Sequence, residues 1–521
     1  MNAAAEWSQG YVTDVSYTNS YFRELSPVWL NHVAAMHGAR PRPIGEGFTH
    51  IDLGCGLGQT SVVLAGCFPQ GKFYGVDFNP AHVDTAQHAA AQLGLTNVTF
   101  IERAFEELLD ADLPQFDFIT LHGIWSWIGE GARQAVVRFI YAKLKPGGIV
   151  YNSYNCLPGW AGDAPIRRLL LELGALHQGD SATRAEKAAK DALELANLKQ
   201  GYFRAQPGAV DQIAKLPKRQ GNYLAHEYLN AAWTTFYSID VADEMAAAKL
   251  TYLGSATLMD NYLELLLGDP AGQHCRKQPT ERLRQLAQDF LTGQRFRRDV
   301  FVRGHPRLPR PEMVRHLREL CFALPGPVED FSEKAKVPRG EITFDPKAME
   351  IIRAAAAQGS ASLAEMTDAA PKGKGAVDLE RTALMLAAVG RLVPTSAPFK
   401  PPRAAQQPAK VRVLGDINRK LVTLGRQTMT RQHLVSPQTG VSIPLDSIEA
   451  VTLARLEEGT PPAKLAEVVG EELKSRGIRI NKDGEPITDA KEAAGRMTEI
   501  AARFVSHQLA TLIRFGIAKP A

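Results

Sequence analysis

The sequence of 521 residues predicts an α/β protein with a doubly wound sheet in its N-terminal third, followed by a helical domain and smaller C-terminal modules. Two observations carry this prediction. Between residues 48 and 160, short apolar runs alternate with runs of helical spacing, as in parallel sheets whose helices cover both faces. Glycines crowd the turn after the first apolar run, where such a sheet binds a ligand.

The stretch from residue 50 to residue 77, HIDLGCGLGQTSVVLAGCFPQGKFYGVD, has the order strand, glycine turn, helix, strand. Asp52 lies near the end of the first strand and Asp77 closes the second. This order describes a Rossmann-like, mononucleotide-binding βαβ half. A ligand can approach the backbone closely at glycine, which has no Cβ. If the ligand carries a ribose, the Asp77 carboxylate can accept hydrogen bonds from both of its hydroxyls. The turn contains Gly54, Gly56 and Gly58.

The glycines stand at every second position, unlike the dinucleotide pattern G-x-G-x-x-G, and no Gly-Lys-Ser/Thr follows. The spacing D-x-G-x-G-x-G, with an acid closing the next strand, resembles the cofactor loop of class I methyltransferases that use S-adenosyl-L-methionine. The resemblance implies that cofactor. We expect its binding residues to be Asp52, Gly54, Cys55, Gly56, Gly58, Asp77, Phe78, Ala104, Phe105 and His122.

The remaining elements of the sheet follow in order. NPAHVDTAQHAAAQLGL predicts a helix opened by Pro80, and NVTFIE predicts a third strand. FDFITLHGIWSWI predicts a fourth strand with an aromatic loop, EGARQAVVRFIYAKLKPGG a helix, and GIVYNSYNCLPGW a fifth strand. Ligands bind outside the carboxyl ends of such strands. Asp52, Asp77, His122 and Tyr154 all fall at these ends.

Aromatic side chains cluster where a methyl group would emerge. Trp125 and Trp127 follow the fourth strand, and Tyr154 and Asn155 end the fifth. Methyl transfer from a sulfonium is an in-line displacement, so the protein must align the partners, exclude water and face the cation with oxygens or aromatic rings. Hydrophobic core is the competing interpretation of the two tryptophans.

The N-terminal residues 8–45 carry spaced aromatics. They predict either a helix packed on the domain or a flap that closes over the ligand with a tyrosine hydroxyl inward. A lysine acceptor would have to lose its proton, at a cost of roughly 4–5 kcal/mol at pH 7. Desolvation lowers that cost. Tyr17, Tyr21 and His122 are candidates to orient the amine or accept its proton.

The rest of the chain predicts separate units. Residues 163–270 look helical, with the aromatic stripe of 221–261 read mainly as core. RFRRDVFVRG (295–304) predicts a solvated strand edge, or less favourably a docking surface for an acidic partner. Two similar stretches begin at Gly340 and Gly440 and suggest two winged-helix-like modules. The expected domains are 1–165, 166–305, 306–394, a Pro-rich linker at 395–411, and 412–521.

Charge and composition limit the partners. The net charge is +4, and the helix after Gly440 carries acids that would repel phosphate. We therefore expect the modules to contact protein, a homodimer included, rather than nucleic acid. The five cysteines form no C-x-x-C pair or zinc spacing, so we expect reduced thiols, a cytoplasmic location and no metal. No signal peptide and no stretch long enough for membrane insertion is expected.

Further motifs make the resemblance more specific. Three motifs resemble those of bacterial methyltransferases that carry a methyltransferase regulatory domain. They are LHGIWSWI (121–128), SYNCLPGW (153–160) and the pattern Tyr17, Tyr21, Pro27. This group includes rickettsial protein-lysine methyltransferases that act on outer-membrane proteins, and residues 222–268 resemble its regulatory domain. The resemblance implies methyl transfer to lysines of an outer-membrane or surface protein. One departure is Ala104, where many class I enzymes place an acid for the adenine amino group.

Two other functions fit the same cofactor block. The acceptor can be a small metabolite, although the large C-terminal additions argue against it. Alternatively, the chain can be a non-catalytic protein that senses the cofactor, since the loop alone predicts binding and not turnover.

Overall fold

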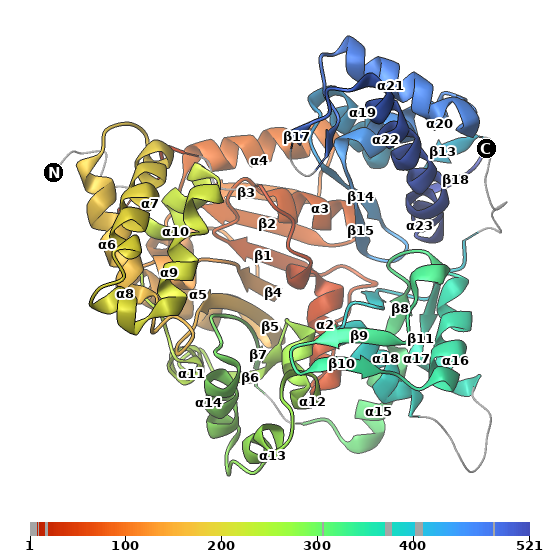
Figure 1. Ribbon diagram of the computed structural model, residues 1–521. Coiled ribbons are helices and arrows are strands. Elements are labelled where there is room, and N and C mark those ends of the chain that lie inside the picture. Colours follow the sequence, from red (N-terminus) through yellow and green to blue (C-terminus); the bar gives the residue numbers. More distant parts are fainter. Residues whose placement is uncertain are drawn as a thin grey trace.

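The structure is a computed structural model that describes residues 8, 10–15, 19–304, 307–369, 378–401, 410–482 and 485–521. Tyr17 and residues 402–409 of the expected Pro-rich linker lie outside the described residues. A seven-stranded sheet with the order β3-β2-β1-β4-β5-β7-β6 forms the centre of the N-terminal half (Figure 1). The smaller C-terminal units pack beside it.

Five strands of the sheet are parallel and alternate with helices, as the sequence pattern predicts. Their side chains are apolar along most of their length because helices cover both faces of the sheet. The β4 side chains, for example, are all buried. The strands are β1 (Thr49–Leu53), β2 (Lys72–Asp77), β3 (Val98–Glu102), β4 (Phe116–Leu121) and β5 (Leu144–Asn155), with helices α3 (Gln59–Cys67), α4 (Pro80–Leu93) and α5 (Glu130–Lys143).

Two antiparallel strands complete the sheet: β6 (Leu250–Ser255) and β7 (Phe296–Arg303). β7 pairs with both β5 and β6, so it is an interior strand and its residues from Asp299 to Val302 are buried. The prediction of a solvated edge at 295–304 was wrong, because a basic composition does not reveal that neighbours cover the strand. The helical prediction for 163–270 was likewise wrong at β6. The sheet therefore continues past the domain boundary expected at residue 165.

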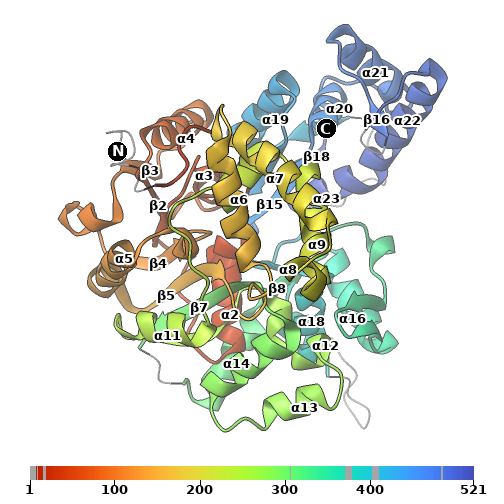
Figure 2. The ribbon, with the colours of Figure 1, turned by 60° about the vertical axis from the view of Figure 1, so that its left-hand side comes forward.

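Helices between β5 and β6 form a separate layer with its own alanine-rich core. Figure 2 brings α6 and α7 of this layer to the front of the sheet. The layer contains α6 (Ala164–Leu176), α7 (Ser181–Asn197), α8 (Tyr202–Ala205), α9 (Pro207–Ile213) and α10 (Gly221–Tyr228). Around β6 and β7 lie α11 (Ser238–Ala246), α12 (Leu263–Leu266), α13 (Ala271–Arg276) and α14 (Glu281–Thr292).

The C-terminal half consists of helices with two- and three-stranded sheets. After α15 (Arg310–Glu319), the first unit contains β8 (Cys321–Ala323), β9 (Lys334–Val337), β10 (Gly340–Thr343), α16 (Pro346–Ala357), β11 (Ser360–Ser362), α17 (Leu363–Asp368), α18 (Leu379–Ala388) and β12 (Val393–Thr395). The second contains β13 (Val411–Val413), α19 (Asp416–Thr428), β14 (Gln432–Ser436), β15 (Val441–Leu445), α20 (Ser447–Glu457), α21 (Leu465–Ser475), β16 (Asn481–Lys482), β17 (Glu485–Pro486), α22 (Ala490–Arg503), α23 (Leu509–Arg514) and β18 (Ala518–Pro520).

The cores of these units are continuous with the faces of the large sheet. One cluster joins α2 (Pro27–Met36) and α3 to the first C-terminal unit, and a second joins α4 to the last unit. Val435 of β14 packs closely on Gly66 of α3, where a Cβ would lie 3.2 Å from Cγ1 of Val435. On the opposite face, α5 and α11 cover β1, β4 and β5. Within the described chain, no helix combines the length and apolarity that a membrane crossing requires.

Candidate functional site

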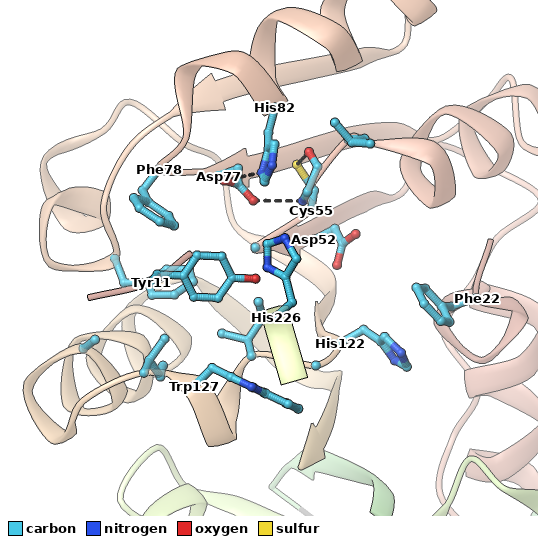
Figure 3. A pocket seen from close by; sticks show the side chains of 18 of the residues that line it. Tyr11, Phe22, Asp52, Cys55, Asp77, Phe78, His82, His122, Trp127 and His226 are labelled. Atoms are coloured by element: carbon cyan, nitrogen blue, oxygen red, sulfur yellow. Dashed lines mark hydrogen bonds and ion pairs between the residues drawn. The ribbon is translucent and has the colours of Figure 1, made fainter. Parts of the chain in front are cut away.

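A cavity of about 530 Å³ lies at the carboxyl ends of the parallel strands. The glycine turn, Asp77 and the ends of β4 and β5 line one side, while the N-terminal segment, α10 and β7 line the other. In Figure 3, Tyr11 and His226 project into the space between Asp77 and Trp127. The site is therefore built from segments that are far apart in the sequence.

The glycine turn is held against β2, and its shape requires glycine. The backbone N–H groups of Gly54 and Cys55 both donate to the Val76 carbonyl, at 2.7 and 2.9 Å. Gly54 has φ +75°, and a Cβ there would lie 2.3 Å from Cδ1 of Ile124. Gly56 has φ +53° and lines the cavity, where a Cβ would meet nothing within 4 Å. The turn thus leaves bare backbone facing the cavity, as a nucleoside ligand needs.

Gly58 serves the turn in another way. It also has a positive φ, at +74°, and a Cβ there would lie 2.5 Å from that of Ala86. Gly58 therefore allows the turn to pack closely on α4, and it does not line the cavity.

Asp77 is fixed by its own neighbours. Oδ2 accepts the N–H of Gly56 at 2.9 Å, and Oδ1 accepts the N–H of Asn79 at 2.9 Å. Nδ1 of His82 lies 3.2 Å from Oδ1 (Figure 3). Oδ2 keeps a further lone pair, so the group can accept a ribose hydroxyl of the implied cofactor. His82 lines the cavity too and was not predicted.

Asp52 also lines the cavity, from the end of β1. Thr120 donates its hydroxyl to Oδ1 at 3.0 Å. Burial raises the pKa of Asp52 to about 7, with the nearby Asp77 acting in the same direction. Asp52 is therefore poised to accept a cationic group of a ligand or to donate a hydrogen bond, depending on pH.

His122 lies in a dry, aromatic setting. Its ring stacks on Phe22 with centroids 3.7 Å apart, and Nδ1 is 2.8 Å from the Tyr151 hydroxyl. Burial lowers the pKa of His122 to about 3. The imidazole is thus neutral at physiological pH, and it is too weak a base to take a proton from an ammonium group. We therefore keep His122 as a cavity-lining residue and not as a proton acceptor.

The predicted adenine end matches the cavity in part. Phe78, Ala104 and Phe105 line it, together with Arg103 and Glu106. Glu102, the acid at the end of β3 that could hold adenine in place of one at position 104, does not line the cavity. Backbone between Arg103 and Phe105 is therefore the better candidate.

The two tryptophans have different roles. Trp127 lines the cavity, whereas Trp125 is fully buried and donates its Nε1–H to Glu244 of α11 at 2.9 Å. Trp125 belongs to the core under the loop. The loop position alone could not separate these two neighbours.

Tyr154 and Asn155 likewise point in different directions, because successive side chains of a strand alternate between faces. Asn155 lines the cavity. Tyr154 is fully buried and donates its hydroxyl to Asp299 at 2.5 Å. Asp299 also accepts the Nε–H of Arg297 at 2.9 Å, and Arg297 forms an ion pair with Asp289 of α14 at 2.5 Å. Tyr154 thus anchors a buried ionic cluster beneath the site instead of touching a substrate.

The N-terminal segment contributes to the cavity, but not through the predicted tyrosine. Tyr21 lines a second cavity of about 460 Å³, where its ring packs on His433 of the last unit. The residues that reach the main cavity from this segment are Ser8, Tyr11, Asn19, Ser20, Phe22 and Leu25. Tyr11, and not Tyr21, is therefore the tyrosine of the described part of this segment that lines the cavity, and the flap stays a prediction.

One part of the cavity lining was missed by sequence reasoning. It contains Trp160, Tyr223, Glu227 and Arg295, from the loop after β5, from α10 and from the start of β7. The Arg295 guanidinium stacks over the Trp160 ring at 4.4 Å and pairs with Asp163. The run LAHEYLN was the available signal, since it carries His226 and Glu227 within an otherwise apolar stripe.

Comparisons with known proteins agree with this site. Residues 44–224 match a family described as a methyltransferase domain, and residues 220–303 match a predicted methyltransferase regulatory domain. Protein sll1526 of Synechocystis is 34% identical over 513 residues, which covers 98% of this chain and 99% of that protein. RP789 of Rickettsia prowazekii is 26% identical over 301 residues, covering 57% of this chain and 53% of that protein.

A solved structure shares the fold over nearly the whole chain. PKMT2 from Rickettsia typhi, in complex with AdoHcy, matches 95% of this chain and 99% of its own, with a TM-score of 0.71 and 18% identity. Bare glycine backbone and an anchored Asp77 at one end of the cavity fit S-adenosylmethionine as the cofactor. The chain belongs to the S-adenosylmethionine-dependent methyltransferases that carry a methyltransferase regulatory domain.

Proposed function

We propose that the protein transfers a methyl group from S-adenosylmethionine to lysine side chains of a protein substrate by in-line displacement. One observation carries the proposal. The cavity that the glycine turn lines also contains a carboxyl group among aromatic rings, because Glu227, Tyr223 and Trp160 belong to the same lining. An aliphatic amine is the acceptor that an acidic, aromatic pocket selects, since both parts attract a cation.

The residues of the chain divide the work between binding and exclusion of water. The bound cofactor supplies an electrophilic methyl group on a sulfonium. Asp77 and the glycine turn hold the nucleoside end. Trp127, Trp160 and Tyr223 give the other end apolar walls, which lower the cost of presenting an amine without its proton. Lysine fits because its four methylene groups can cross such walls while the amine reaches inward.

The solved structure named PKMT2 supports the acceptor class by analogy, since that abbreviation denotes a protein-lysine methyltransferase. By the same analogy we propose an outer-membrane or surface protein as substrate, methylated in the cytoplasm before export. The winged-helix identity of the C-terminal units, a homodimer and the lack of nucleic-acid binding remain our predictions. Apolar clusters join these units to the sheet. We expect the units therefore to hold a fixed position, on which a protein substrate can dock.

A blocked-lysine comparison tests the acceptor. Purified protein with labelled cofactor is given poly-L-lysine, an unfolded β-barrel outer-membrane protein, and the same two after reductive dimethylation of their lysines. We expect label in the untreated proteins and none in the blocked ones. Equal label in blocked and untreated proteins would point to another side chain and would contradict the lysine proposal.

The two alternative functions have their own outcomes in this experiment. Label that appears only in small molecules from a cell extract indicates a metabolite methyltransferase. Cofactor binding without any turnover, in the presence of both extract and proteins, indicates a non-catalytic sensor.

A further inference from the structure

The carboxyl group of Glu227 is an unusual component of the cavity wall. Glu227 lies on α10, next to His226, and lines the cavity. It forms no ion pair within 4.0 Å with any part of the chain that the structure describes. Glu227 is half-buried, and partial removal of a carboxylate from water without a cationic partner is unfavourable, so its position there calls for an external partner.

The groups that surround Glu227 do not neutralise it. From its own helix, Tyr223 and Tyr228 face it, and both are neutral phenols whose pKa values its charge raises further. Asn155 approaches from the end of β5. The charged neighbour is Arg295, which is already committed to Asp163 and to the Trp160 ring. The pocket is therefore short of one positive charge.

We propose that Glu227 binds the ammonium group of the acceptor and removes its proton. This inference rests on the proposed function, because it names the residue that prepares the amine for that reaction. The location agrees with the role: Asn155, beside Glu227, ends the fifth strand, next to the β4 end where the methyl group should emerge.

The step balances without a further reactant. Nζ of the acceptor lysine gives a proton to the Glu227 carboxylate, and the freed lone pair forms the N–C bond with the donor methyl carbon. The S–C bond breaks and leaves its electron pair on sulfur, which becomes an uncharged thioether. Methylated lysine then leaves as a cation, and Glu227 returns its proton to water. Burial raises the pKa of Glu227 to about 7, which suits a base that must both take and release a proton near neutral pH.

The first test measures amine binding without turnover. n-Butylamine, which mimics the lysine side chain, is titrated by calorimetry into the protein saturated with S-adenosylhomocysteine at pH 8. We expect Glu227→Gln to weaken butylamine binding at least tenfold, while its affinity for S-adenosylhomocysteine stays unchanged. Glu194→Gln, an exposed glutamate on α7, is the matched control and should bind both like the wild type. Butylamine affinity that is equal in wild type and Glu227→Gln, or absent in both, overturns the proposal.

The second test measures turnover on poly-L-lysine across pH 5.5–9. We expect the wild-type rate to fall below about pH 7 and Glu227→Gln to lose at least a hundredfold with no such inflection. Glu227→Asp, which keeps the charge, should regain part of the rate and guards against a folding defect in the Gln variant. Methylation by Glu227→Gln at the wild-type rate overturns the inference and leaves the proposed function standing. If butylamine binding depends on Glu227 but no protein is methylated, the role of Glu227 in amine binding stands and the proposed function is contradicted.

Discussion

The most direct physical consequence of a half-buried Glu227 without an ion-pair partner is a pH-dependent loss of stability, which Glu227→Gln should remove. Burial raises the pKa of the carboxyl from its ordinary value of 4.5 to about 7. In that interval the folded state binds more protons than the unfolded state, so stability falls as pH rises. The wild type is free of this penalty below pH 4.5 and carries all of it above pH 7. The full penalty is about 3 kcal/mol.

The substitution should therefore stabilise the protein, and more so at high pH. Between pH 5 and pH 8 the advantage of Glu227→Gln over the wild type should grow by about 2.5 kcal/mol. For a chain of 521 residues that unfolds as one unit, this corresponds to roughly 2 °C in Tm. Comparing the two proteins at each pH cancels the contribution of Asp52, whose pKa is raised in the same direction.

Differential scanning calorimetry and urea unfolding at pH 5, 6, 7 and 8 measure the difference. Glu194→Gln serves as the control, because it removes an exposed carboxyl and should show no trend with pH. A difference between Glu227→Gln and wild type that stays constant from pH 5 to pH 8 would refute the reasoning. It would mean that Glu227 is solvated or paired in the folded protein.

Three further outcomes follow from the structure. Asp77→Ala should weaken binding of S-adenosylhomocysteine by about tenfold or more in calorimetry, because it removes a charge-assisted hydrogen-bond acceptor at the ribose end; unchanged affinity would remove Asp77 from the site. Arg297→Met should cost about 3–5 kcal/mol in urea unfolding, since Asp289 and Asp299 would stay buried without their cation, and stability at the wild-type level would show that the cluster is hydrated. Tyr21→Phe should leave the affinity for S-adenosylhomocysteine unchanged, as Tyr21 lines the other cavity; a clear loss would place it at the cofactor.

The cofactor end of the site was predictable because its signals are local in the sequence. Asp52, the glycine turn and Asp77 are spaced by one strand, one helix and another strand, and the chemistry of each position follows from that order. Two strands of the C-terminal half were predictable for the same reason. Short strands were expected after Gly340 and Gly440, and β10 and β15 are there.

Errors arose where a position depends on distant segments. Trp125 and Trp127 are two residues apart in one loop, yet one meets Glu244 of α11 and the other the cavity. Tyr154 was expected to face a substrate, but β7 supplies Asp299 on that side and draws the hydroxyl into the core. Nothing within a local window of sequence contains this information, because the strand partner lies more than a hundred residues away.

The segment matched to the methyltransferase regulatory domain, residues 220–303, forms part of the site itself. Its strands β6 and β7 extend the sheet beyond β5, and through Asp299 they fix the end of β5 that presents Asn155. The stretch from β5 to β7 also delivers α10, whose His226 and Glu227 line the cavity. A methyltransferase sheet with an open acceptor end would admit water to the amine and to the donor. By contributing Glu227 and Tyr223 to the cavity, this stretch supplies the acidic and aromatic lining on which the proposed selection of lysine rests.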